Sequence, residues 1–335
     1  MKFRHSIVAA GVTAALLALP AAAQFSERTL RLSNGVNQEH PVGNGVAKMD
    51  ACVREKSGGK MKIQSFWGGA LGGDLQATQS LRSGTQEMVV TSTSPLIGIL
   101  PDLGVFDLPF LFANEKEADA ILDGEFGKYI SDKMPSVGLV NLAYWENGFR
   151  NLTNSKKPVN RVEDMPGLKV RVMQNNVFLD TFKTMGANAV PMAFGEVFTA
   201  LETKAIDGQE NPFVTIDTSK FYEVQKYLSV TRHAYTPFMV LYSKPLWDKL
   251  SPAEQKVLQE CAIAGRDEQR KVSRALSDKS LADLKTKGMI VNEISPAEQK
   301  RLRDAVKPVY DKHAATIGKE TVDKMNAALS KIRGS

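Results

Sequence analysis

Strands and helices alternate regularly near the beginning of the chain. We read strands over residues 29–33, 62–67 and 87–92, separated by helices over residues 42–56 and 74–83. Glycines follow both helices, as is common where a helix ends. Strands that alternate with helices of this length form βαβ units and a largely parallel sheet. The pattern therefore predicts an α/β fold.

In sheets of this kind, ligands bind beyond the carboxyl ends of the strands. That rule points to Asn34 after the first strand, to the stretch from Trp67 to Asp74 after the second, and to the stretch from Thr91 to Pro95 after the third. The loop GGALGGD in the second stretch has Ala70 at the position where a dinucleotide fingerprint needs its second glycine. We therefore expect a site for a small ligand other than a nucleotide.

A further strand is predicted for GLKVRVM at residues 167–173, where apolar and other side chains alternate. The alternation points Arg171 away from the apolar face. A guanidinium can hold a carboxylate through two hydrogen bonds, and Arg150 offers a second one. Either arginine could equally form an ordinary salt bridge, with Glu146 or Glu163 as the nearest candidates, and spacing alone does not decide between these roles.

Four long segments together resemble a known family. They read WENGFRNLTNSKKPV, GLKVRVM, PMAFGEVFTALETKAIDGQENP and KFYEVQKYLSVTRHAY, in this order along the chain. They are similar to the solute-binding proteins of tripartite ATP-independent periplasmic (TRAP) transporters of the DctP type. Within that family the chain looks most like the members that bind sugar acids. The resemblance covers nearly the whole chain after its first residues.

The resemblance implies a type II periplasmic binding protein-like α/β fold with two lobes, a cleft between the lobes and a long bracing helix. Residues 24–147 and 236–275 would form lobe I. Residues 148–235 and 276–335 would form lobe II. We therefore expect a cleft that closes on a small organic anion.

Family roles transfer to matching positions of this chain. By resemblance, Arg171 would clamp a ligand carboxylate, Arg150 would supply a second cation, Asn211 would hold an oxygen beside it, and Phe194 would cover the ligand. Lobe I would contribute Asn34, Asp74, Trp67 and Ser92 from the other side of the cleft. His40, close to the end of the first strand, is either a further ligand contact or a surface or capping residue.

Two cysteines, Cys52 and Cys261, fall in helical patterns far apart in the sequence. In an oxidising compartment such a pair tends to form a disulfide, although two isolated thiols are equally compatible with the sequence. The family layout puts both helices in one lobe, which favours a disulfide.

Residues 1–23 have the features of a secretory signal, with Lys2 and Arg4 before an apolar run and a cleavage site near Ala23. We therefore expect a periplasmic protein without stable membrane insertion. Cleavage lowers the formal net charge from +6 to +4. This excess is too small and too dispersed for a nucleic-acid-binding surface.

No catalytic or metal-binding motif is recognisable in the chain. His40, His233 and His313 lie far apart, and the HExxH, CxxC and GxSxG patterns are absent. We therefore expect no enzyme activity, no cofactor and no metal. The rival interpretation is a periplasmic enzyme, such as a lyase, that acts on an acidic carbohydrate. A ligand-binding domain of a sensor is a third possibility.

The preferred ligand is a sugar acid such as a uronate, an aldonate or a keto-aldonate. The alternative is a C4-dicarboxylate or a 2-oxo acid. A dicarboxylate would need a second strong cation in lobe I, for which Arg82 or Lys48 could serve. The expected partners are the membrane permease subunits of a TRAP transporter, and the expected state is a monomer.

Overall fold

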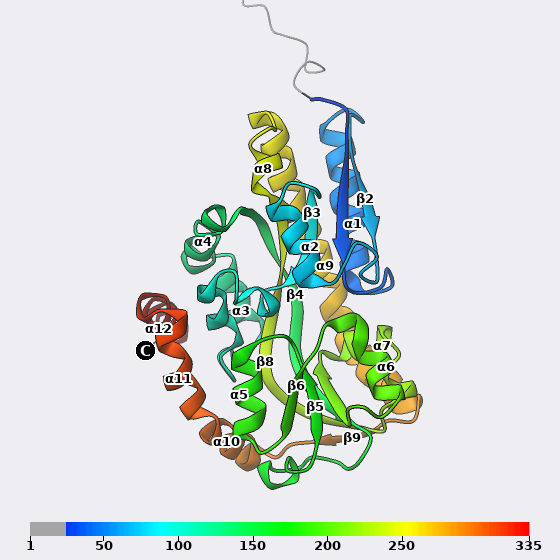
Figure 1. The fold of residues 1–335 in the computed structure, drawn as a ribbon, viewed down its shortest axis with the longest axis vertical. Helices are drawn as coiled ribbons and strands as arrows, with labels where there is room; N and C mark the ends of the chain where they lie inside the picture. Colours follow the sequence, from blue (N-terminus) through cyan, green and yellow to red (C-terminus); the bar gives the residue numbers. More distant parts are fainter. Residues whose placement is uncertain (1–24, 335) are drawn as a thin grey trace, which may run out of the picture.

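The computed structural model describes residues 25–334, which form an elongated mixed α/β molecule (Figure 1). The predicted signal segment lies outside the described residues. Among residues 25–334, no helix combines the length and the apolar character that crossing a membrane requires.

One sheet runs through the whole described part of the chain. Eight of its nine strands follow the order β2, β1, β3, β8, β4, β7, β5, β6, and the ninth, β9, pairs with the first residues of β8. The strands are β1 (Arg28–Asn34), β2 (Met61–Phe66), β3 (Met88–Ser92), β4 (Leu139–Asn154), β5 (Lys169–Val172), β6 (Asn188–Pro191), β7 (Gly208–Asn211), β8 (Tyr227–Ser243) and β9 (Ile290–Glu293). The predicted βαβ units at the start of the chain are confirmed.

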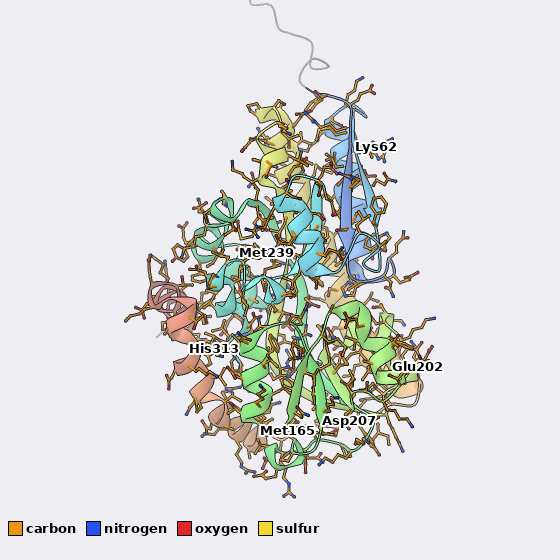
Figure 2. The ribbon with its side chains drawn as sticks, in the orientation of Figure 1. Lys62, Met165, Glu202, Asp207, Met239 and His313 are labelled. Carbon is orange, nitrogen blue, oxygen red and sulfur yellow. A yellow bond between two sulfur atoms is a disulfide. The ribbon has the colours of Figure 1, made fainter. Side chains whose placement is uncertain are left out.

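The middle of the sheet is antiparallel. Strand β8 lies between β3 and β4 and runs antiparallel to both, whereas β1 to β3 are parallel to one another and β5 is parallel to β6 and β7. Strands β4 and β8 are long enough to extend from the upper part of the molecule to the lower part (Figure 1). Met239 on β8 is fully buried near the middle of the molecule, while Lys62 on β2 is exposed (Figure 2). The two ends of the sheet are therefore joined by two continuous strands.

The helices cover the sheet and connect its strands. They are α1 (Pro41–Lys56), α2 (Asp74–Arg82), α3 (Glu115–Leu122), α4 (Glu125–Ser131), α5 (Asn176–Thr184), α6 (Val197–Glu202), α7 (Phe213–Thr218), α8 (Lys244–Trp247), α9 (Pro252–Thr286), α10 (Pro296–Ala305), α11 (Lys307–Ile317) and α12 (Lys319–Arg333). Helices α1, α2 and α8 accompany β1 to β3 in the upper part, and α5 to α7 accompany β5 to β7 in the lower part (Figure 1).

The 35-residue helix α9 packs against both parts of the molecule. Its first turn is fixed by a capping box, in which the Ser251 hydroxyl accepts from the Glu254 N–H and the Glu254 carboxylate accepts from the Ser251 N–H. Close to α1, a Cβ on Gly45 would lie 2.5 Å from the Trp145 ring and one on Gly265 would lie 2.7 Å from it. Only glycine therefore allows α1 and α9 to enclose this tryptophan.

A disulfide also joins these two helices. It links Cys52 on α1 to Cys261 on α9, with 5.5 Å between the Cα atoms. The bonded cysteines are 209 residues apart in the sequence. Helix α9 is thus held covalently to the helix that follows the first strand.

The last two helices return toward the upper part of the molecule. The Thr321 hydroxyl is hydrogen-bonded to the Tyr129 hydroxyl of α4 at 3.0 Å, and Arg333 pairs with Glu117 of α3 at 2.7 Å. We predicted α12 in lobe II and residues 115–131 in lobe I. The C-terminal segment therefore connects the two predicted lobes.

Candidate ligand-binding site

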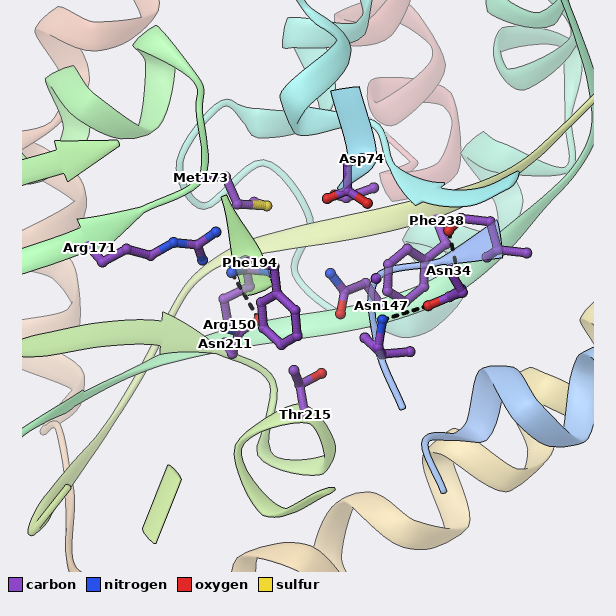
Figure 3. A pocket seen from close by; sticks show the side chains of 14 residues that line it. Asn34, Asp74, Asn147, Arg150, Arg171, Met173, Phe194, Asn211, Thr215 and Phe238 are labelled. Atoms are coloured by element: carbon purple, nitrogen blue, oxygen red, sulfur yellow. Dashed lines mark hydrogen bonds between the residues drawn. The ribbon is translucent and has the colours of Figure 1, made fainter. Parts of the chain in front are cut away.

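A cavity lies between the two ends of the sheet (Figure 3). It is bounded by the carboxyl ends of β1, β3 and β7, by the start of α2, by the middle of β4 and by β5. Seven of the nine predicted ligand-binding residues line it: Asn34, Asp74, Ser92, Arg150, Arg171, Phe194 and Asn211. The cavity therefore follows the rule that ligands bind beyond the carboxyl ends of strands.

Arg171 enters the cavity from β5 and is only 2% exposed. Its Nε and Nη2 donate to the Met192 carbonyl oxygen at 3.0 and 2.7 Å. Its Nη1 is buried and has no hydrogen-bond partner within residues 25–334. Burial lowers the pKa of this guanidinium to about 10. No salt bridge joins Arg171 to any described acid, so a buried cation lacks an anion.

Arg150, by contrast, is already paired. Its Nη2 donates to the Glu210 carboxylate at 2.8 Å and to the Glu210 carbonyl oxygen at 2.6 Å, and its Nη1 donates to the Thr236 hydroxyl at 3.2 Å. Both members of the ion pair are fully buried. Although burial alone would raise it, the pKa of Glu210 is lowered by the Arg150 charge and by hydrogen bonds from His233 and Arg150.

The ordinary salt bridge that was the alternative for Arg150 therefore exists, but not with the expected acids. Glu146 pairs with Arg274 at 2.7 Å, and Glu163 pairs with Arg301. The actual partner, Glu210, lies on β7, which pairs with β4 directly beside Arg150. For Arg171 neither candidate acid is a partner.

Asn147 is a cavity residue that the sequence did not single out. It is 6% exposed, and its Oδ1 is buried without a hydrogen-bond partner in the described part of the chain. Asn147 is the extra residue at a register shift of β4 between Glu146 and Gly148, where Gly148 has a φ of 116°. This bulge lets Asn147 and Arg150, three positions apart, line the same cavity (Figure 3).

Asp74 faces the cavity from the first turn of α2 (Figure 3). Burial raises the pKa of its carboxyl, while the Thr91 hydroxyl and the Arg171 charge act in the opposite direction. Asn34 uses both ends of its amide on the protein, donating to the Val90 carbonyl at 3.1 Å and accepting from the Val36 N–H at 2.7 Å. Asp74 is therefore the more available of these two side chains.

Two of the predicted residues do not line the cavity. His40 is buried, its Nδ1 accepts from the Val42 N–H at the start of α1, and its Nε2 lies 3.1 Å from the Thr215 hydroxyl. Burial lowers the pKa of His40 to about 3, so the ring is neutral at neutral pH. Trp67 packs against the apolar core around α1. His40 thus performs the capping role that was its alternative and touches a cavity residue.

The remaining cavity residues are Thr215 on α7, Met173, Phe238 on β8, Val90 on β3, and Gly35 and Val36 beside Asn34. Phe194 and Phe238 provide aromatic surface, and the ring centroid of Phe194 is 5.9 Å from the Arg171 guanidinium. Within residues 25–334, no group of three or more His, Cys, Asp or Glu side chains is arranged to hold a metal ion. The site therefore combines one unpaired cation, a few polar groups and an aromatic wall, which suits an organic anion.

Comparisons with known proteins point to one family. A family model described as DctP, bacterial extracellular solute-binding protein, family 7, matches residues 32–316. The 2,3-diketo-L-gulonate-binding periplasmic protein YiaO of Escherichia coli K12 is 35% identical over 290 residues, covering 87% of this chain and 88% of that protein.

Solved structures share the fold over almost their whole length. The sugar acid binding protein DctPAm of Advenella mimigardefordensis, in complex with galactonate, is 48% identical with a TM-score of 0.90, covering 92% of this chain and 99% of that one. A TRAP periplasmic solute binding protein of Sulfurospirillum deleyianum with bound succinate is 29% identical with a TM-score of 0.86, covering 91% and 100%. With the family model matched along most of its length, this chain belongs to the DctP family of bacterial extracellular solute-binding proteins.

Proposed function

We propose that this solute-binding protein captures a sugar acid by binding its carboxylate to Arg171. The observation that carries this proposal is the buried Nη1 of Arg171, which has no partner among the described residues. A guanidinium that is removed from water without an anion is costly, and a bound carboxylate would remove that cost. The Nη1 and Nη2 groups together match the two oxygens of a carboxylate.

The rest of the cavity favours a hydroxylated ligand. Asp74, Asn147, Ser92 and Thr215 offer oxygen and amide groups that can exchange hydrogen bonds with hydroxyls. The aromatic rings of Phe194 and Phe238 offer apolar surface for the carbon chain. Relatives with bound galactonate, D-erythronate and galacturonate support this ligand class, while a succinate-bound relative supports the alternative of a C4-dicarboxylate.

The remaining predicted residues take supporting roles in this proposal. Arg150 adds positive charge behind the ligand, although Glu210 balances it. Asn211 accepts from Arg150 Nη2 at 3.1 Å and thereby orients it. His40 orients Thr215 from outside the cavity.

Family membership makes the protein the solute-binding part of a TRAP transporter rather than an enzyme. We infer that the two predicted lobes close on the ligand and that the closed form is recognised by the permease subunits. Cleavage of a signal near Ala23 and a monomeric state also belong to this proposal.

Calorimetry on refolded protein tests the proposal, with D-galactonate, D-galacturonate, succinate, pyruvate and galactose as ligands. We expect binding of acids and no binding of the neutral sugar. Arg171→Met should weaken binding of the preferred acid by about tenfold to 150-fold, because a hydrogen bond to a charged group contributes about 1.5–3 kcal/mol.

Lys169→Met is the matched control, because Lys169 is an exposed cation two positions earlier on the same strand. Its affinity should equal that of the wild type. Equal binding of galactose, or wild-type affinity in Arg171→Met, would show that Arg171 does not hold the ligand carboxylate.

A further inference from the structure

The charges that line the cavity nearly cancel before a ligand enters. Its ionisable lining residues are Asp74, Arg150 and Arg171. Glu210 neutralises Arg150 through direct contacts. What remains is one cation, Arg171, and one carboxylate, Asp74, which face the same space (Figure 3).

Asp74 is placed so that its carboxylate stays open to a ligand. It is the first residue of α2, where the helix dipole favours an anion. Gly35 lies beside it, and a Cβ at that position would contact Asp74 Oδ1 at 3.4 Å, so the absence of a side chain there leaves this oxygen uncovered. No described Lys, Arg or His forms a salt bridge with Asp74. The Thr91 hydroxyl is a hydrogen-bond partner within the protein, and the remaining lone pairs of the carboxylate are available to accept hydrogen bonds from ligand hydroxyls.

A second ligand carboxylate would meet no unpaired cation in this cavity, because Arg150, the other cation that lines it, is paired with Glu210. Arg82 and Lys48, the two candidates for a distal cation, do not line it. Arg82 instead donates to the Val137 carbonyl at 2.9 Å and to Gln79 at 3.0 Å on the protein surface. With one carboxylate on Arg171, the other would lie near Asp74 and would be repelled in a poorly solvated space.

We infer that Asp74 determines specificity by accepting hydrogen bonds from a polyhydroxylated monocarboxylate and by repelling the second carboxylate of a dicarboxylate. This inference rests on the proposed function, because it needs the first carboxylate to occupy Arg171. Discrimination of this kind comes from a repulsive group as much as from an attractive one. Asp74 thereby selects aldonates over aldarates of the same length.

Two ligands that differ at one end test this directly. D-Galactonate ends in a CH2OH group, and galactarate has a carboxylate at that position with the same number of carbons. We expect wild-type protein to bind galactonate at least about tenfold more tightly than galactarate, the size of effect that one unfavourable charge contact produces. Asp74→Asn should weaken galactonate binding, strengthen galactarate binding, and reduce the ratio of the two affinities by about tenfold or more.

Asp132→Asn is the control, because Asp132 is exposed on the surface beside Lys128. Its ratio of affinities should equal that of the wild type. Asp74→Ser serves as a second variant, with thermal midpoints measured for both to establish folding. A wild type that binds both ligands equally, or an unchanged ratio in both folded variants, would overturn the role of Asp74 while leaving the sugar-acid function intact. Failure of the wild type to bind any acid would instead overturn the proposed function together with this inference.

Discussion

Arg171 in the cavity and Arg274 on α9 differ in whether acidic side chains form salt bridges with them. Arg274 donates to Asp119 at 2.8 Å through both Nη atoms and to Glu146 at 2.7 Å, and hydrogen bonds to Asp119 and Glu146 raise its pKa despite partial burial. Arg171 is more deeply buried, donates its hydrogen bonds within residues 25–334 to the Met192 carbonyl, and has a pKa that burial lowers. Arg274, which joins α9 to β4 and α3, therefore forms salt bridges with two acids. Arg171, in the cavity, forms no salt bridge with a described acid.

This difference in pairing implies that Arg274 contributes to the stability of the fold, whereas Arg171 contributes to ligand binding. Fully paired arginines hold elements together in the absence of any ligand. An unpaired buried arginine costs stability until an anion arrives, which is a common trade at functional sites. Variants of the paired and the unpaired arginines should therefore differ in their effects on the free energy of unfolding and on ligand affinity.

The largest effect is expected from Glu210→Gln, which would turn Arg150 into a second unpaired buried arginine. Removing one partner of a buried ion pair leaves an uncompensated charge and costs about 3–5 kcal/mol. Urea unfolding should report a loss of that size. Glu163→Gln is the control, since its pair with Arg301 is exposed and screened by solvent, so this variant should unfold at nearly the same urea concentration as the wild type. Equal losses in the two variants would contradict the importance of burial.

A smaller loss is expected from Arg274→Met, which removes the paired member of the comparison. Glu146 is 5% exposed and would lose its cation. We expect a loss of about 1–3 kcal/mol, at the lower end because the Arg274 side chain is partly in contact with solvent. Ligand affinity should stay at the wild-type value. Lys271→Met, an exposed change on the same helix, should alter neither the stability nor the ligand affinity. A large loss of affinity in Arg274→Met would show that Arg274 also contributes to ligand binding.

The smallest effect is expected from Arg171→Met in the absence of ligand, and it has the opposite sign. Replacing an unpaired buried charge by an apolar side chain should raise the free energy of unfolding by about 1 kcal/mol. The thermal midpoint should then rise by about 2 °C. Lys169→Met should leave the midpoint unchanged. A marked fall for Arg171→Met would mean that its bonds to Met192 stabilise the fold, so that Arg171 would resemble Arg274 after all.

Local patterns predicted much of this arrangement. The alternation in GLKVRVM indicated the face of Arg171, and the strand ends indicated Asn34, Asp74 and Ser92. Ion pairs between strands that are distant in the sequence could not be predicted from such local patterns. Glu210 lies 60 residues from Arg150, and only the pairing of β7 with β4 brings them together.

Asn147 was missed for a different reason. Its orientation depends on a bulge in β4, and the glycine that permits the bulge gives no sign in the sequence of which side chain is turned into the cavity. Resemblance supplied the site roles, because several of them rest on contacts between distant segments. Physical reading of the sequence and family resemblance therefore contributed different parts of the prediction.

The position of β8 between β3 and β4 has a consequence for the order in which the protein can assemble. Ribosomes make the chain from its amino end, so β1 to β7 exist before the strand that joins β3 to β4. Until residue 243 has been synthesised, the sheet has a gap at its centre and unpaired strand edges on either side. The native sheet therefore cannot be completed until translation is well advanced.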